Sequence, residues 1–305
     1  MSELKLLETV HPQKEAQARF EALVGIDSHK QQLVSELSLR LDVSRVKKWQ
    51  KHHHPKGLPI MSALTSGPPL VLLSGEVGCG KTALATSVGT PLARELDRKI
   101  VALETPSNIR GRGLVGELSA RITEAFDQAC ARAAHGSDGS LLIIDEADDL
   151  ATAREQSQAH HEDRAGVNVL IKQIDRLARE SIPLVVMLIT NRAQALDAAV
   201  TRRACLHLRF ERPDRRQRRA VMERLLLGTS ANAGDLDMLA EASRAKGHVP
   251  FSFSDLTLRL ARSALQTAIH QDRPFDAALL LDELARIEPS PLVVARPTDD
   301  EVQDG

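Results

Sequence analysis

The sequence is poor in aromatic residues: among its 305 residues it has no tyrosine, one tryptophan and six phenylalanines. The core must therefore be built from aliphatic side chains, and the aromatic platforms on which single-stranded nucleic acids stack would be hard to assemble. The formal net charge is −1, which excludes a uniformly basic nucleic-acid coat protein. The three cysteines, Cys79, Cys130 and Cys205, stand far apart and lack the spacing of metal ligands.

Long apolar segments are missing as well. The first residues contain no apolar signal core, and no run reaches the roughly 18 apolar residues that a membrane helix needs. The few, scattered cysteines suit a reducing compartment. We therefore expect a soluble cytoplasmic protein without a membrane partner. Because 42% of the residues are hydrophobic, the chain can bury a substantial core.

Five short apolar runs alternate with helical or polar stretches, at residues 70–73, 100–103, 141–144, 184–189 and 206–210. This pattern predicts a parallel five-stranded sheet covered by helices on both faces. A single helix is expected over 27–50, and helical patterns continue from about 214 to 287. We expect four parts: an N-terminal extension (1–22), a large α/β domain (23–211), a small all-helical lid domain (212–290) and a disordered acidic tail (291–305).

The first apolar run leads directly into a glycine-rich loop, and a helical pattern follows. Residues 70–82 read LVLLSGEVGCGKT, which is the phosphate-binding loop pattern in the setting that it requires. The backbone N–H groups of such a loop wrap phosphates, Lys81 reaches the β- and γ-phosphates, and the Thr82 hydroxyl is a ligand of Mg²⁺. The sequence thus predicts ATP and Mg²⁺ as cofactors. The expected nucleotide contacts in this loop are Gly75, Glu76, Val77, Gly78, Cys79, Gly80, Lys81, Thr82 and Ala83.

Two further apolar runs end in polar residues suited to hydrolysis. After residues 141–144, Asp145 is placed to hold Mg²⁺ with Thr82, and Glu146 to polarise the attacking water as a general base. After residues 184–189 come Thr190 and Asn191, and the Asn191 amide can orient that water. Arg202 and Arg203 follow Asn191 by eleven and twelve residues. An arginine there can complete the active site of a neighbouring subunit.

Taken together, these motifs resemble those of the AAA+ ATPases over nearly the whole chain. The resemblance implies an α/β P-loop NTPase fold with a helical lid, ATP hydrolysis, and assembly into a ring that we expect to be a homohexamer. The matching segments are GEVGCGKT as Walker A, LLIIDEAD as Walker B, Asn191 as sensor 1, LDAAVTRRA (196–204) as the arginine-finger segment, PFSFSDL (250–256) as the lid motif, and Val24, Gly25 and Ile26 as backbone lining the adenine pocket.

Residues 164–176, RAGVNVLIKQIDR, resemble a narrower group, the pachytene-checkpoint and thyroid-receptor-interactor branch, whose members remodel HORMA-domain proteins. That branch places its finger arginine directly before alanine, which favours Arg203 over Arg202. Its bacterial members accompany cGAS/DncV-like nucleotidyltransferases in cyclic-oligonucleotide anti-phage signalling (CBASS). The resemblance therefore implies that this enzyme opens a HORMA-domain partner, which can be bound to such a nucleotidyltransferase, and regulates the system negatively.

Three features depart from the family pattern. Leu114, Val115 and Gly116 fall where the family carries pore loop 1, but Leu114 replaces its aromatic residue. Only about twenty residues precede Val24, so the ring itself or an adaptor would have to recruit the substrate. The lid has no arginine at positions 253–254, where this branch carries its sensor 2 arginine. Arg259 or Arg262 of the following helix could take that role instead.

A cluster of arginines follows residue 211. It is predicted to be a solvated helix face, and contact with nucleic acid is the less favoured interpretation. An alternative function, a DNA-acting AAA+ module similar to a clamp loader or a transposition regulator, depends on that second interpretation. The cluster consists of Arg212, Arg215, Arg216, Arg218 and Arg219.

Overall fold

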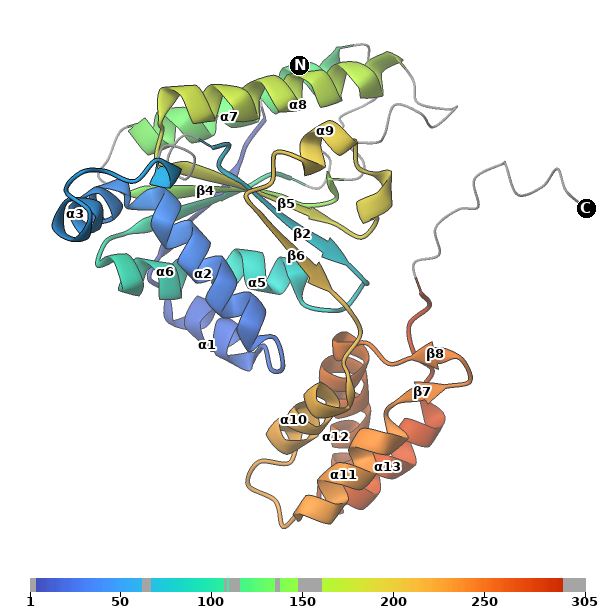
Figure 1. The fold of residues 1–305 in the computed structure, drawn as a ribbon. Coiled ribbons are helices and arrows are strands. Elements are labelled where there is room, and N and C mark those ends of the chain that lie inside the picture. Colours follow the sequence, from blue (N-terminus) through green and yellow to red (C-terminus); the bar gives the residue numbers. More distant parts are fainter. Residues whose placement is uncertain are drawn as a thin grey trace, which may run out of the picture. The chain divides into compact units, whose positions relative to one another are not determined.

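The structure is a computed structural model, and it describes residues 4–61, 67–106, 109, 116–134, 138–147 and 161–292 (Figure 1). The chain divides into two compact units, each of which is described by itself. One unit comprises Met1–Ser74 and Lys81–Arg209, and the other comprises Gly75–Gly80 and Phe210–Gly305. The glycine-rich loop is therefore grouped with the C-terminal part of the chain.

Within the described residues, the main sheet has six strands in the order β1-β3-β4-β5-β2-β6. The five predicted strands are confirmed, and β3, β4, β5 and β2 pair in parallel. The sheet has one strand more than the five predicted, because β1 pairs with β3 in antiparallel orientation at the edge of the sheet. The strands are β1 (Leu7–His11), β2 (Leu70–Gly75), β3 (Ile100–Glu104), β4 (Gly139–Ile144), β5 (Leu184–Thr190) and β6 (Leu206–Phe210).

The edge strand β1 was not predicted from the sequence, and the reason is physical. Its sequence, LETVH, is mostly exposed and only His11 is fully buried, so it has no apolar run to detect. After it, α1 (Lys14–Ala22) contacts α5 and α6. Residues 7–22 are thus folded as part of the first unit.

Helices cover both faces of this sheet (Figure 1). On one face, α7 and α8 pack against each other and bury Ile122, Phe126 and Ile174 in the main core cluster, in which Phe126 is the only aromatic residue among the described members. On the other face lie α2, α5 and α6, which contact β5 or β3. The helices of this unit include α2 (Asp27–Leu41), α3 (Val43–His53), α5 (Lys81–Ser87), α6 (Gly89–Leu96), α7 (Glu117–Ala134), α8 (His161–Glu180) and α9 (Ala198–Thr201).

The single helix expected over residues 27–50 is in fact two helices. The first, α2, ends at Leu41, and α3 begins at Val43. Asp42 separates them because its side chain accepts a hydrogen bond of 3.0 Å from the backbone N–H of Arg45 and so caps the new helix.

The second unit contains the lid, which the sequence predicted to be wholly helical. That prediction was wrong at one place, where β7 (Ala245–Lys246) and β8 (Val249–Pro250) form a short antiparallel hairpin. Paired capping boxes at Asp214 and Asn232 start two of the helices. The helices are α10 (Arg215–Leu225), α11 (Ala233–Ala242), η3 (Asp255–Leu260), α12 (Ala261–His270) and α13 (Ala277–Arg286). Across both units, no helix in the described part of the chain has the length and apolarity to cross a membrane.

Candidate active site

The glycine-rich loop adopts a backbone that only glycine tolerates at two crowded positions. Gly75 has φ +125°, and a Cβ atom there would lie 2.0 Å from the carbonyl oxygen of Phe210. Gly78 has φ +73°, and its Cβ would lie 2.8 Å from the hydroxyl oxygen of Ser252. Both the dihedral angles and the close neighbours therefore require glycine. A loop whose backbone N–H groups wrap a phosphate needs such positive φ values and such close backbone packing, so the two glycines fit a phosphate-binding loop.

The loop is held in place by backbone hydrogen bonds to later parts of the chain. The N–H of Glu76 donates to the carbonyl of Phe210 (2.9 Å), and the N–H of Ser254 donates to the carbonyl of Gly78 (2.9 Å). Cys79 is buried, and its thiol contacts the Val77 carbonyl at 3.7 Å. The predicted lid motif at residues 250–256 thus contacts the predicted phosphate loop directly.

Thr82 and Asp145 are brought together by the fold of the first unit. Helix α5 begins with Lys81, which is 4% exposed, followed by Thr82. Asp145 comes directly after strand β4. The Thr82 hydroxyl donates to the Oδ2 atom of Asp145 over 2.7 Å. Mg²⁺ prefers oxygen ligands at about 2.0–2.1 Å in octahedral geometry, in which neighbouring ligand oxygens are about 2.9 Å apart. The two side chains therefore fit a shared magnesium ion.

Glu146 has an unusual backbone conformation beside this pair. Its φ is +55°, in the left-handed region that residues other than glycine seldom adopt. Its N–H donates to the second carboxylate oxygen of Asp145 over 2.8 Å, and its side chain is exposed. Backbone strain of this kind often accompanies functional positions. The turn anchors Asp145 and leaves the Glu146 carboxylate free to face solvent or substrate.

Glu104 is a neighbouring carboxylate that the sequence analysis missed. It is the last residue of β3, the strand beside β4, and is half-buried. Burial raises its pKa, the negative charge of Asp145 adds to the increase, and Arg19 opposes it. A charged residue ending a parallel strand, next to the strand that ends at Asp145, was the signal that could have revealed it.

The predicted sensor lies at the same edge of the sheet. Strand β5 is parallel to β4 and ends at Thr190, whose buried hydroxyl accepts from the N–H of Arg192 (2.9 Å). Asn191 comes next. Because parallel strands place their carboxyl ends on one edge, Asn191 and Asp145 emerge on the same side.

The two candidate finger arginines have different surroundings. Arg203 forms a bidentate ion pair with Asp175 of α8, with hydrogen bonds of 2.8 and 3.0 Å, and also donates to the Ala199 carbonyl. Arg202 is exposed, and its Nε donates to the Ala198 carbonyl over 3.3 Å. The structure therefore gives a defined orientation to Arg203, whereas the hydrogen bond of the Arg202 side chain to a described residue is the longer one to the Ala198 carbonyl.

Several predicted positions have limited structural description. In the expected adenine segment, Ile26 is buried and Gly25 has φ +80°, while Val24 is half-buried. Leu114 and Val115 of the expected pore loop lie outside the described residues. Gly116 (φ +80°) is described, and its carbonyl accepts from the Ala120 N–H in the first turn of α7.

The prediction that the arginine cluster forms a solvated face was wrong for two of its members. The side chain of Arg212 is only 6% exposed, and so is Arg218 as a whole residue. Arg218 donates to the carbonyls of Ala240 and Pro213, each at 2.9 Å. These carbonyl groups accept the hydrogen bonds that water would otherwise accept, so the guanidinium can be buried. Arg259, one alternative for sensor 2, is paired with the buried carboxylate of Asp255.

Known proteins are similar to this chain over nearly its full length. The model for the ATPase family associated with various cellular activities (AAA) matches residues 71–213. The CD-NTase-associated protein 6 of Escherichia coli (strain MS 115-1) is 37% identical over 93% of this chain and 94% of its own length.

Two solved structures are likewise similar to this chain over nearly its full length. A chain in the E. coli MS115-1 HORMA:CdnC:Trip13 complex is also 37% identical, with a TM-score of 0.88 over 96% of this chain and 98% of that one. Rhizobiales Trip13 is 31% identical, with a TM-score of 0.75 over 93% of this chain and 98% of its own.

Proposed function

Since the chain belongs to the AAA family of ATPases, in the group of CD-NTase-associated protein 6, we propose that it forms a homohexameric ring that uses ATP to open or disassemble a HORMA-domain partner. The protein is a nucleotide-binding ATP hydrolase. The observation that carries the partner assignment is the whole-length agreement with the chain in the HORMA:CdnC:Trip13 complex. The proposed partner is a HORMA-domain protein, free or bound to a nucleotidyltransferase, and the proposed place of action is the cytoplasm.

In the proposed site, the backbone of Gly75–Gly80 binds the phosphates of ATP, and Lys81 contacts the β- and γ-phosphates. Thr82 and Asp145, whose oxygens are 2.7 Å apart, hold Mg²⁺. The chemistry that such an ion would supply is neutralisation of the negative charge of the phosphates.

Glu146 takes a proton from the attacking water, and Asn191 orients that water. The left-handed turn at Glu146 ties its backbone to Asp145, so the base and the metal ligand share one rigid unit. Arg203 of one subunit completes the site of the next, where it stabilises the charge that develops on the γ-phosphate. In this proposal, its ion pair with Asp175 orients the guanidinium of Arg203 towards the γ-phosphate of the neighbouring site.

Opening of the partner requires that ATP hydrolysis moves part of the ring. Residues 114–116 are the proposed pore contact with an extended segment of the partner, and the lid is the proposed moving part. As a negative regulator of a nucleotidyltransferase-based anti-phage system, the enzyme would release the nucleotidyltransferase from its HORMA activator.

The alternative function, action on DNA, is not favoured. It depended on a basic face formed by the arginines after residue 211. Arg212 and Arg218 are buried, and Arg215 and Arg219 form ion pairs with Asp237. Burial of two of the five arginines and pairing of two others with Asp237 reduce the positive charge that a phosphate backbone would meet.

The test uses the chain with Glu146→Gln, which should bind ATP without turning it over. Loaded with ATP, it should capture a HORMA-domain protein of the kind present in the HORMA:CdnC:Trip13 complex, and gel filtration should resolve the product as six copies of this chain with one substrate. Wild-type enzyme with ATP should instead release the nucleotidyltransferase from that HORMA protein. Failure of both capture and release, in a preparation that still hydrolyses ATP, would show that the partner assignment is wrong.

A further inference from the structure

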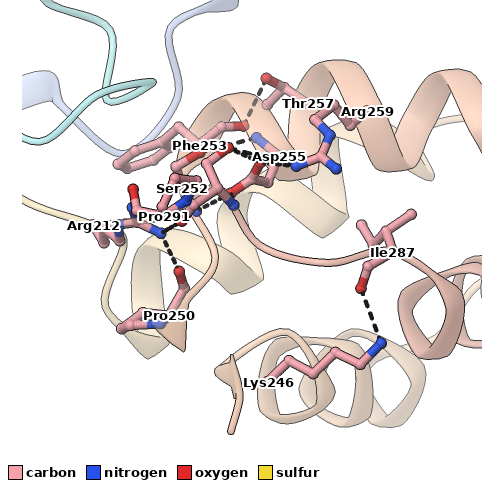
Figure 2. A network of polar contacts seen from close by, with 11 residues as sticks. Arg212, Lys246, Pro250, Ser252, Phe253, Asp255, Thr257, Arg259, Ile287 and Pro291 are labelled. Atoms are coloured by element: carbon pink, nitrogen blue, oxygen red, sulfur yellow. Dashed lines mark hydrogen bonds and ion pairs between the residues drawn. The ribbon is translucent and has the colours of Figure 1, made fainter. Parts of the chain in front are cut away.

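Arg212 is a buried charged residue that connects three separate segments of the second unit. It lies two residues after the end of β6, and its side chain is 6% exposed. Its Nη1 donates to the carbonyl of Pro250 (Figure 2) and to that of Ser290, and its Nη2 donates to the carbonyl of Pro291. The last two of these bonds are 2.8 Å long. A planar guanidinium can serve several acceptors at once because its five N–H donors have fixed directions.

The fourth acceptor of Arg212 belongs to the phosphate loop itself. Its Nη2 lies 3.4 Å from the Oε2 atom of Glu76, the second residue of the glycine-rich motif. The backbone N–H of Glu76 is also bonded to the carbonyl of Phe210, two residues before Arg212. Glu76 is therefore attached to the same stretch of chain through both its backbone and its side chain.

The ion pair also solves an electrostatic problem. A carboxylate in a phosphate-binding loop would repel the negative charges of a bound nucleotide. The positive charge of Arg212 offsets that of Glu76, which is 27% exposed. The position of this loop carboxylate relative to the phosphates thus matters for binding, and the contact with Arg212 restrains that position.

On its other side, Arg212 holds a peptide that the lid fixes a second time. Asp255 is fully buried and accepts hydrogen bonds from both the N–H (3.0 Å) and the hydroxyl (2.6 Å) of Ser290. The same carboxylate binds Arg259 and the N–H of Ser252 (Figure 2). Ser290 is therefore clamped between Asp255 and Arg212. A movement of the guanidinium would therefore move Ser290 and the C-terminal segment of the lid that contains it.

We propose that Arg212 is a positioning residue that couples the nucleotide state of the phosphate loop to the C-terminal segment of the lid, residues 287–291, through its ion pair with Glu76. Nucleotide phosphates restrict the loop and hence Glu76, and Glu76 in turn restricts Arg212 and the carbonyls that it binds. The coupling uses the ATP hydrolase activity alone. Its failure would leave the HORMA-domain assignment untouched.

The decisive variant is Glu76→Gln, which removes the loop charge but leaves the three carbonyl contacts of Arg212 in place. Hydrogen exchange of the peptide spanning residues 285–292 is measured with and without a saturating non-hydrolysable ATP analogue. In the wild type, the analogue should slow exchange about fivefold. In Glu76→Gln, which should still bind the analogue, the slowing should fall below about twofold, and kcat should drop about fivefold with KM changed less than about twofold.

Two further variants make the result interpretable. Arg212→Lys keeps the charge but lacks the planar fork, so it should lose part of the nucleotide-dependent protection. Arg216→Gln, at an exposed position of α10, should behave as wild type in both exchange and turnover. The proposal is overturned if the analogue leaves exchange of this peptide unchanged in the wild type. It is also overturned if Glu76→Gln and Arg212→Lys both keep the full wild-type protection.

Discussion

The guanidinium of Arg203 is clamped by the carboxylate of Asp175 through two parallel hydrogen bonds, 2.8 Å from Nε and 3.0 Å from Nη2. The hydrogen bonds that Arg203 donates to Asp175 raise the pKa of Arg203 above its ordinary value. The Arg203 side chain is still 30% exposed, so part of its guanidinium is accessible from outside this chain. The pair joins the segment after α9 to helix α8, and it gives a candidate finger residue a fixed direction.

We expect Arg203→Ala to lower kcat for ATP on the order of 10³-fold, because a finger arginine stabilises charge that develops in the transition state. Steady-state ATPase assays on the assembled ring measure this effect. Arg202→Ala is the matched control and should change kcat less than about threefold. The reverse order of effects would make Arg202 the finger.

Asp175→Asn tests whether the clamp positions Arg203. The neutral amide cannot form two charge-assisted hydrogen bonds with the guanidinium, so kcat should fall about tenfold while KM for ATP stays within about twofold. Asp175→Glu, which restores the charge, should recover part of the loss. An increase of kcat in Asp175→Asn would mean that the ion pair restrains Arg203 instead of orienting it.

Glu146→Gln should reduce kcat by about 10²- to 10³-fold, since the amide cannot accept the proton of the attacking water. Nucleotide affinity, measured with a fluorescent ATP analogue, should change less than about threefold, because the backbone turn at residue 146 tolerates glutamine as well as glutamate. Wild-type turnover in this variant would remove Glu146 as the general base. Asp145→Asn provides the contrast, because it should weaken binding of ATP in the presence of Mg²⁺.

Thr82 provides a test of the magnesium site that keeps the fold unchanged. Thr82→Ala removes one of two oxygens that lie 2.7 Å apart, and the Mg²⁺ concentration for half-maximal ATPase activity should rise at least about tenfold. Thr82→Ser retains the hydroxyl and should stay within about twofold of the wild type. An unchanged magnesium requirement in Thr82→Ala would show that this hydroxyl is not a ligand.

The stability of the lid should depend on acid through Asp255. Burial alone would raise the pKa of Asp255, but hydrogen bonds from the Ser290 hydroxyl, the N–H groups of Ser252 and Ser290, and Arg259 together lower it from 3.8 to about 2. Because the folded-state pKa is lowered, the contribution is complete above about pH 4 and is lost as the pH falls towards 2. Its size is on the order of 2 kcal/mol.

Asp255→Asn should therefore lower the free energy of unfolding by about 2 kcal/mol at pH 7, measured by denaturant titration of the lid transition. About half of this difference should be gone at pH 3. Asp282→Asn, an exposed partner of Arg273, should cost less than about 0.5 kcal/mol at either pH. A difference between wild type and Asp255→Asn that did not change with pH would contradict the assignment of the charge to this buried network.

The strands and the phosphate loop could be predicted from the sequence because their signals are local. Continuous apolar runs at residues 70–73 and 141–144 can only be satisfied inside a sheet that is covered on both faces. The positions of Gly75 and Gly78 follow from a backbone with positive φ. Asp145 and Glu146 were placed by the end of a strand. In each case the residues that specify the feature lie within a few positions of one another.

Other features depend on partners far away in the chain. The edge strand β1 is stabilised by pairing with β3, so its own residues need little apolar character. The short hairpin β7–β8 in the lid comprises only two residues per strand, too few for a periodic pattern. Glu104 gains its altered pKa from burial and from Asp145, neither of which its immediate neighbours indicate.

The arginines after residue 211 show this division most clearly. The sequence alone determined that they are many, that they follow the last strand, and that acidic residues accompany them. It could not distinguish Arg212 and Arg218, which are buried, from the exposed Arg215 and Arg216. Only the tertiary structure decided that Arg212 meets Glu76 and the carbonyls of residues 250, 290 and 291, because desolvating a charge is tolerable only where several acceptors converge from distant segments.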